Sequence, residues 1–249
     1  MAAPVLVETP STSPSVPLEA RLTSTRAILP PRADREPIRT ERLLLRPIAA
    51  SDAEALHVLR TQPEVMQWTM VGKVDENLDQ TREWIANFLP PKDEFQYEWV
   101  VIYKGSKGEE EEGNDLLIGV GGIKNFNPQP PVLGYMFVKE YWHKGIATEF
   151  LRAVLAAWWA LPRREVEVGS DAQADLASVK GRRQDMHSNM ARVPEYLSAV
   201  IAESNKGSNR VLEKCGFKEY KRWKEPESRA GHEGEDALLV GLLLEAPTN

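Results

Sequence analysis

The sequence predicts a mixed α/β domain whose central sheet carries helices on both faces. Apolar strands and amphipathic helices follow in the order strand, helix pair, three strands, helix, strand, helix, strand pair. The chain has 249 residues, 42% of them hydrophobic, which is enough for one sizeable core. We therefore expect one domain over residues 37–249. We expect the Pro-, Ser- and Thr-rich tail at 1–36 to be disordered.

Charge and cysteine content exclude several classes of protein. The formal net charge is −6, so the chain lacks the overall positive charge that nucleic acid or an anionic membrane attracts. Cys215 is the one cysteine, which rules out an intrachain disulfide and fits a reducing, cytoplasmic setting. The histidines lack metal-ligand spacing, and no apolar run is long enough for a membrane helix. We expect a soluble, metal-free monomer or homodimer.

The domain begins with a strand and a helical pair. Residues 40–47 form an apolar stretch typical of a strand. Ser51 is a good N-cap for a helix that ends before Pro63, and an apolar face at helical spacing predicts a second helix over 78–88.

Three strands follow the helical pair. Two of them, at 97–103 and 116–123, are joined by a loop whose glutamate run at 109–112 is expected to be solvated. A Pro-rich connector at 127–131 then leads to the third strand, at 133–138.

A tight turn and a long helix come directly after this third strand. Apolar residues recur at three- and four-residue steps until Pro162 ends the helix. At the start of such a helix, the backbone N–H groups of 143–148 have no partner within the helix, and the helix dipole adds positive charge. Gly145 and the small Ala147 allow a phosphate to approach the backbone closely. The sequence therefore predicts an anion site at this turn.

A second strand–helix unit lies downstream. The strand at 196–202 leads to Asn205, a good N-cap, with Ser208 in the first turn of a short helix. Gly216 can take the left-handed conformation that ends this helix. Two final strands are expected at 219–223 and 237–244.

The turn at 141–149, Tyr-Trp-His-Lys-Gly-Ile-Ala-Thr-Glu, resembles the acyl-CoA pyrophosphate loop of the GNAT superfamily of N-acetyltransferases. The superfamily loop has the form Gln/Arg-x-x-Gly-x-Gly/Ala, and this chain has Trp142, Gly145 and Ala147 at those places. Trp142 matches the ribosomal-protein-alanine acetyltransferase branch. That branch carries Gly where this chain has His143, which is a departure.

Two further stretches strengthen the resemblance. Residues 202–217 resemble the downstream block of the superfamily, and 40–46 resemble the opening T-x-R-L-x-L-R signature of the same branch. The resemblance implies a mixed, mostly antiparallel sheet in which the strands at 133–138 and 196–202 splay apart to admit the pantetheine arm. Residues 162–195, where the family has a short loop, are a surface insertion that is either a flap over the acceptor site or a mobile loop.

The same resemblance implies acetyl-CoA as co-substrate and an amine as acceptor. The residues that it assigns to acetyl-CoA are Met136, Phe137, Val138, His143, Lys144, Gly145, Ile146, Ala147, Thr148, Asn205, Ser208 and Arg210. Val65, Trp68, Met70, Trp84 and Phe88 are the candidates for contact with the acceptor, although each has the alternative role of a core residue.

The chemistry implied is direct attack of a primary amine on the thioester, without a covalent intermediate. Many superfamily members protonate the thiolate with a Tyr, but this chain has Leu212 near that place. The ribosomal-protein branch offers a Ser, so Ser208 is the candidate proton donor. The alternative role of Ser208 is helix capping. The candidates for the general base are Glu98, Tyr135 and Glu140, with a water chain as the alternative. The acceptor is either a protein N-terminus or a small molecule. A non-catalytic acyl-CoA-binding module is the alternative function.

Overall fold

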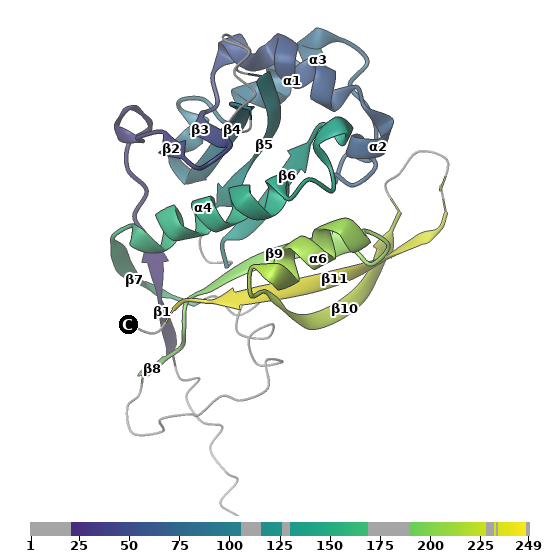
Figure 1. Cartoon of the computed structure of the whole chain (residues 1–249). Coiled ribbons are helices and arrows are strands. Elements are labelled where there is room, and N and C mark those ends of the chain that lie inside the picture. Colours follow the sequence, from purple (N-terminus) through teal and green to yellow (C-terminus); the bar gives the residue numbers. More distant parts are fainter. Residues whose placement is uncertain are drawn as a thin grey trace, which may run out of the picture.

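The protein is organised around a large twisted sheet. A computed structural model describes residues 21–105, 116–125, 130–168, 190–227, 232 and 234–247. Within these ranges the strands form an eight-stranded sheet and a separate three-stranded sheet (Figure 1). The large sheet runs in the order β10 (Lys218–Pro226), β11 (Asp236–Glu245), β9 (Tyr196–Ala202), β6 (Val132–Phe137), β5 (Leu116–Lys124), β4 (Gln96–Tyr103), β3 (Leu43–Pro47) and β2 (Ile38–Arg39).

Neighbouring strands of the large sheet are antiparallel, except for β6 and β9, which are parallel. The predicted mixed, mostly antiparallel sheet is therefore confirmed. The predicted strands are present with small differences in their ends. For example, β3 begins at Leu43 and not at Thr40, because the Thr40 N–H bonds to the Leu43 carbonyl (3.0 Å) and closes a turn.

Helices cover both faces of the sheet, as predicted. Because neighbouring residues of a strand point to opposite faces, Trp99 and Val100 of β4 mark the two sides. Trp99 packs in the core that contains Phe150 and Leu212, whereas Val100 packs in the core that contains Leu56. The helices are α1 (Ala53–Arg60), α2 (Pro63–Met66), α3 (Leu78–Ala86), α4 (Ile146–Ala160) and α6 (Lys206–Lys214), and the 3-10 turns are η1 (Arg32–Asp34), η2 (Ala50–Asp52), η3 (Lys92–Phe95) and η4 (Lys139–Tyr141). Thus α4 and α6 lie on one face of the sheet, and α1 and α3 lie on the other.

The small sheet joins two segments that are far apart in the sequence. Its central strand β1 (Arg21–Ala27) pairs antiparallel with β7 (Arg163–Glu167) and parallel with β8 (Met190–Arg192). This corrects the expected disorder for residues 21–36. The stretch is polar and has no apolar alternation, so its pairing depends on partners from the insertion that no local pattern reveals.

Some expectations concern residues outside the described ranges. They are the tail before residue 21, the glutamate run at 109–112, the connector at 127–129 and the central part of the insertion at 169–189. Among the residues that the structure does describe, no helix is both long enough and apolar enough to cross a membrane.

Candidate active site

Strands β6 and β9 diverge immediately after a single point of pairing. Val132 pairs with Ser198, and the Ser198 N–H donates to the Pro131 carbonyl (2.8 Å). The Ser198 hydroxyl donates to the same carbonyl (3.0 Å). No later residue of β6 pairs with β9. The predicted splay of these two strands is therefore present, with its closed end at Val132.

The backbone of β6 offers alternate residues to the diverging side. The Val138 N–H donates to the Ile118 carbonyl of β5 (2.9 Å). Because alternate residues of an antiparallel strand bond to the same neighbour, Met136 also faces β5, whereas Tyr135 and Phe137 face β9. This corrects the expectation that backbone N–H groups of Met136 and Val138 are available to a ligand. Of the three residues predicted, Phe137 alone directs its N–H to the open side.

The turn before α4 has the backbone geometry of an anion site. Gly145, the N-cap of α4, has a φ of 79°, and His143 has a φ of 60°. The backbone N–H groups of residues 143–148 have no hydrogen-bond partner among the described residues. The Trp142 indole N–H donates to the Phe137 carbonyl (2.8 Å), which ties this turn to the open end of β6. Lys144, Ile146, Ala147 and Thr148 lie in this turn and in the first turn of α4, and their contact with acetyl-CoA stays a prediction.

The start of α6 is capped by Asn205. Its side-chain Oδ1 accepts a hydrogen bond from the Ser208 N–H (3.0 Å). The capping group at this turn is thus the Asn205 amide oxygen, and the Ser208 hydroxyl has no part in it. Arg210 lies exposed on the same helix, without a described contact to the phosphate turn.

Tyr135 directs its ring to the face that α4 and α6 cover. The ring lies against Phe137 and Phe150, with centroid distances of 6.0 and 6.3 Å. Its hydroxyl is buried and forms no hydrogen bond with a described residue. Burial raises the pKa of Tyr135 to about 12, against a smaller lowering effect of the nearby Ser208 hydroxyl. A phenol that keeps its proton at neutral pH suits donation, which argues against Tyr135 as the base.

Glu98 lies on the opposite face of the sheet. Its side chain is only 7% exposed. Burial raises the pKa of Glu98 to about 7, although the Lys124 ammonium acts in the lowering direction. A carboxylate with a pKa near 7 is well matched to accepting a proton at neutral pH.

Two glycines lie between Glu98 and the open side of β6. Glu98 pairs with Gly122 across β4 and β5, and Gly122 pairs with Gly134 across β5 and β6. A Cβ on Gly122 would overlap the Tyr97 carbonyl at 2.1 Å, while one on Gly134 would meet nothing within 4 Å. Directly paired residues share a face of the sheet, so no side chain stands between Glu98 and β6 along this row. This arrangement depends on the register of three strands, which the local sequence pattern does not reveal.

The acceptor candidates divide into buried and exposed residues. Val65 and Phe88 are buried in the core under α1 and α3, as in their alternative role. The Trp84 ring stacks edge-on with Phe88 at 4.7 Å, and the Arg60 guanidinium lies 4.4 Å over Trp84. Met70 is 96% exposed. Val65 and Phe88 therefore pack as core residues, and the contact of the whole set with an acceptor stays a prediction.

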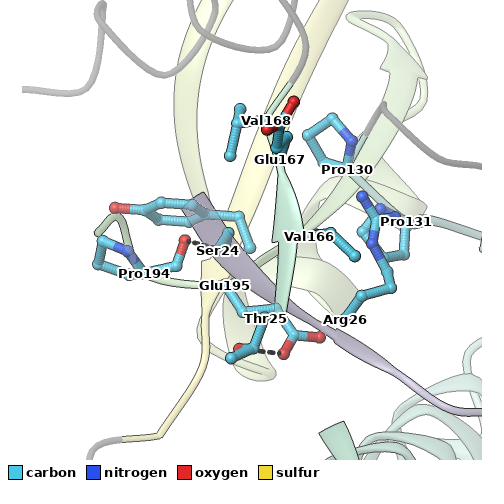
Figure 2. Close-up of a pocket in the computed structure, with 11 residues that line it drawn as sticks. Ser24, Thr25, Arg26, Pro130, Pro131, Val166, Glu167, Val168, Pro194 and Glu195 are labelled. Carbon is cyan, nitrogen blue, oxygen red and sulfur yellow. Dashed lines mark hydrogen bonds between the residues drawn. The ribbon is translucent and has the colours of Figure 1, made fainter. Parts of the chain in front are cut away.

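A pocket lies where the small sheet meets the large one. Figure 2 shows its lining, with Glu195 beside Thr25 and with Pro131 next to the closed end of β6. The Glu195 carboxylate accepts hydrogen bonds from the Thr25 hydroxyl (2.9 Å) and the Arg163 Nε (2.8 Å). The described ends of the insertion therefore pack at the closed end of the diverging strands, away from the phosphate turn.

Comparison with known proteins agrees with this geometry. The family model "Acetyltransferase (GNAT) domain" matches residues 42–218. A search of curated proteins finds no match. Many solved structures share the fold. A probable GNAT-family acetyltransferase from Chromobacterium violaceum is 16% identical, with a TM-score of 0.59 and 98% of both chains covered.

Two further solved structures were obtained with coenzyme A. A spermidine N-acetyltransferase from Vibrio cholerae, solved with CoA and spermine, is 15% identical with a TM-score of 0.57, covering 83% of this chain and 97% of that one. RimL, a ribosomal L7/L12 α-N-protein acetyltransferase solved with CoA, is 17% identical with a TM-score of 0.57, covering 85% and 100%. At these identities the likeness shows the fold, while the family model covers most of the chain. The chain therefore belongs to the GNAT acetyltransferase family, and acetyl-CoA is its co-substrate.

Proposed function

We propose that this acetyltransferase moves the acetyl group to a primary amine by direct attack on the thioester. The observation that carries the proposal is the row of backbone N–H groups at 143–148 that have no hydrogen-bond partner in the described part of the chain. These groups lie at the open end of the diverging strands β6 and β9. An anion bound there and an extended arm laid along β6 would together position a thioester between the two strands.

The donor side uses backbone groups. The diphosphate of acetyl-CoA accepts hydrogen bonds from the amides of 143–148, and Lys144 adds positive charge. The pantetheine arm follows β6, where Tyr135 and Phe137 present their backbone groups. The Phe137 N–H then donates to the carbonyl oxygen that becomes the oxyanion. Asn205 and Arg210 approach the arm from α6.

The acceptor side removes a proton. The amine nitrogen attacks the thioester carbon from the face of α1 and α3, and the tetrahedral intermediate then loses a proton. We assign Glu98 as the acceptor of this proton. Two strand spacings, about 10 Å in all, separate Glu98 from β6, so the proton travels through water along the row of Gly122 and Gly134.

The leaving thiolate is protonated from the other face. As the carbon–sulfur bond breaks, the Ser208 hydroxyl on α6 passes a proton to the sulfur and takes a replacement proton from solvent water, so that CoA leaves as the thiol and Ser208 stays neutral. The Tyr135 hydroxyl lies nearby, is buried and keeps its own proton. We assign Ser208 the donor role, and we assign the neutral Tyr135 phenol beside it an electrostatic supporting role.

The acceptor is a protein N-terminus or a small cationic amine. The solved relatives above include one enzyme for each class, a ribosomal-protein acetyltransferase and a spermidine acetyltransferase. A net charge of −6 favours the approach of a cationic amine of either kind. A reducing, cytoplasmic setting is part of the proposal, since one cysteine permits no intrachain disulfide.

Calorimetric titration with acetyl-CoA, followed by a thiol-release assay over polyamines and N-terminal peptides, tests the proposal. We expect micromolar binding and thiol release with at least one acceptor. Binding without release on any amine would favour the non-catalytic acyl-CoA-binding module. No binding at all would refute the assignment of residues 143–148.

A further inference from the structure

The turn before β3 is hydrogen-bonded to the first turn of α4. The Thr40 hydroxyl donates to Glu149 Oε1 (2.6 Å), and the Arg42 N–H donates to the same oxygen (3.0 Å). The Arg42 Nε donates to Glu149 Oε2 (2.7 Å), and its Nη2 lies 2.7 Å from that oxygen. One carboxylate in the first turn of α4 is therefore held by two residues that are distant in sequence.

Arg42 also holds the phosphate turn itself. Its Nη1 donates to the Lys144 carbonyl (2.9 Å). In a planar trans peptide the carbonyl and the following N–H point in opposite directions. With the Lys144 carbonyl drawn to Arg42, the Gly145 N–H is turned away from it and towards the open side. The Arg42 guanidinium lies 3.5 Å from the place of a Cβ on Gly145, so it packs directly beneath this peptide.

These hydrogen bonds also lower the pKa of Glu149. Burial acts to raise the pKa of Glu149, but the hydrogen bonds from Thr40 and Arg42 outweigh it and leave the pKa below its ordinary value. Glu149 is therefore negative at neutral pH, close to the place where a diphosphate would bind. Without a counter-charge it would repel that ligand, and Arg42 supplies the counter-charge.

We propose that Arg42, supported by Thr40, is a positioning residue of the acetyl-CoA site. It fixes the peptide between Lys144 and Gly145 in the orientation that a diphosphate needs, and it neutralises Glu149. This inference rests on the proposed function, and it assigns a role to the Thr-x-Arg turn, which the sequence comparison identified only as a family signature.

A donor that lacks the diphosphate separates this role from a general structural one. We compare acetyl-CoA with S-acetylpantetheine in the wild type, in Arg42→Ala and in Arg39→Ala. Arg39 lies exposed on β2 and is the control for the loss of one positive charge. We expect Arg42→Ala to raise the Kd of CoA and the KM of acetyl-CoA by about 10- to 100-fold, the worth of a charge-assisted pair. The kcat/KM of S-acetylpantetheine and the KM of the amine should change less than about threefold, as should every parameter of Arg39→Ala.

Two further variants distinguish the proposed role of Arg42 from a general folding defect. Arg42→Lys keeps the charge but cannot span Glu149 and the Lys144 carbonyl with one rigid fork, so we expect an intermediate Kd. In a Glu149→Gln background the Arg42→Ala effect should shrink, because the charge that Arg42 neutralises is gone.

The results that would refute the role of Arg42 differ from those that would refute the proposed function. Equal losses with acetyl-CoA and S-acetylpantetheine, or no loss with either, would overturn the role of Arg42 even if the wild type is active. A wild type that neither binds CoA nor releases thiol would overturn the proposed function, and this inference with it.

Discussion

The two sides of the diverging strands β6 and β9 present different kinds of chemical group. On the side of α4 and α6, the proposed ligand groups are the backbone N–H donors at 143–148 and the hydroxyls of Ser208 and Tyr135. On the side of α1 and α3, the group that the proposed mechanism uses is the buried carboxylate of Glu98. In the proposed mechanism, donor binding therefore depends on backbone conformation, whereas proton removal depends on a single side chain in a low-dielectric environment.

The largest expected effect comes from Glu98→Gln, which removes the proposed base and leaves the acetyl-CoA site unchanged. The amide has the same shape but cannot take a proton, so kcat should fall by about 100- to 1,000-fold while the Kd of CoA stays unchanged. In the wild type, kcat/KM should rise with pH through a pKa near 7. Steady-state kinetics from pH 5.5 to 9 checks this. If kcat/KM of Glu98→Gln still rises with pH through the same pKa, another group is the base.

The same substitution should change stability with a definite pH dependence. Burial raises the pKa of Glu98 from 4.5 to about 7, so the folded state favours the protonated form. The stability associated with this proton is fully present below pH 4.5 and is lost as the pH rises to about 7. Glu98→Gln escapes this loss and should be more stable than the wild type at pH 8, by up to about 3 kcal/mol. Urea unfolding at pH 4.5 and pH 8 measures the difference; an equal gap at both values would contradict the assignment.

Variants of Ser208 and Asn205 distinguish a role in proton transfer from a role in capping helix α6. Because Asn205 Oδ1 accepts from the backbone of Ser208, Ser208→Ala leaves the cap intact. We expect Ser208→Ala to lower kcat by about tenfold with little change in Tm, and Asn205→Ala to cost about 1 kcal/mol of stability. Thermal unfolding and thiol release on both variants test this. A Ser208→Ala protein that loses stability but keeps its kcat would return Ser208 to a structural role.

The smallest effects come from the two residues with positive φ in the phosphate turn. Gly145→Ala adds a Cβ at a φ of 79° and should weaken CoA binding by about tenfold. His143→Gly relieves a φ of 60°, where the family branch carries Gly, and should strengthen binding by about twofold to fivefold. Titrations with CoA check both, and changes of the same sign would show that φ is not the controlling factor.

The donor side could be predicted from the sequence because its parts are local. Gly145 and the apolar spacing that follows it located the start of α4, and Asn205 located the start of α6. Even there, local pattern could not say which amides of β6 are free, because that depends on which side β5 occupies.

The rest of the molecule depends on distant pairing. The proposal of Glu98 over the other base candidates depends on the register that pairs it with Gly122 and pairs Gly122 with Gly134. Strand β1 was hidden because its partners, β7 and β8, come from the insertion. In both cases the missing information is long-range strand register, which apolar periodicity does not encode.

Mapping of backbone amide chemical shifts during a titration with CoA tests the central claim most directly. If the donor site is made of backbone groups on one side of the diverging strands, the largest shifts should fall on residues 143–148 and on Tyr135 and Phe137, while the amides of α1 and α3 stay in place. Largest shifts on α1 and α3, or no shifts at 143–148, would contradict the account.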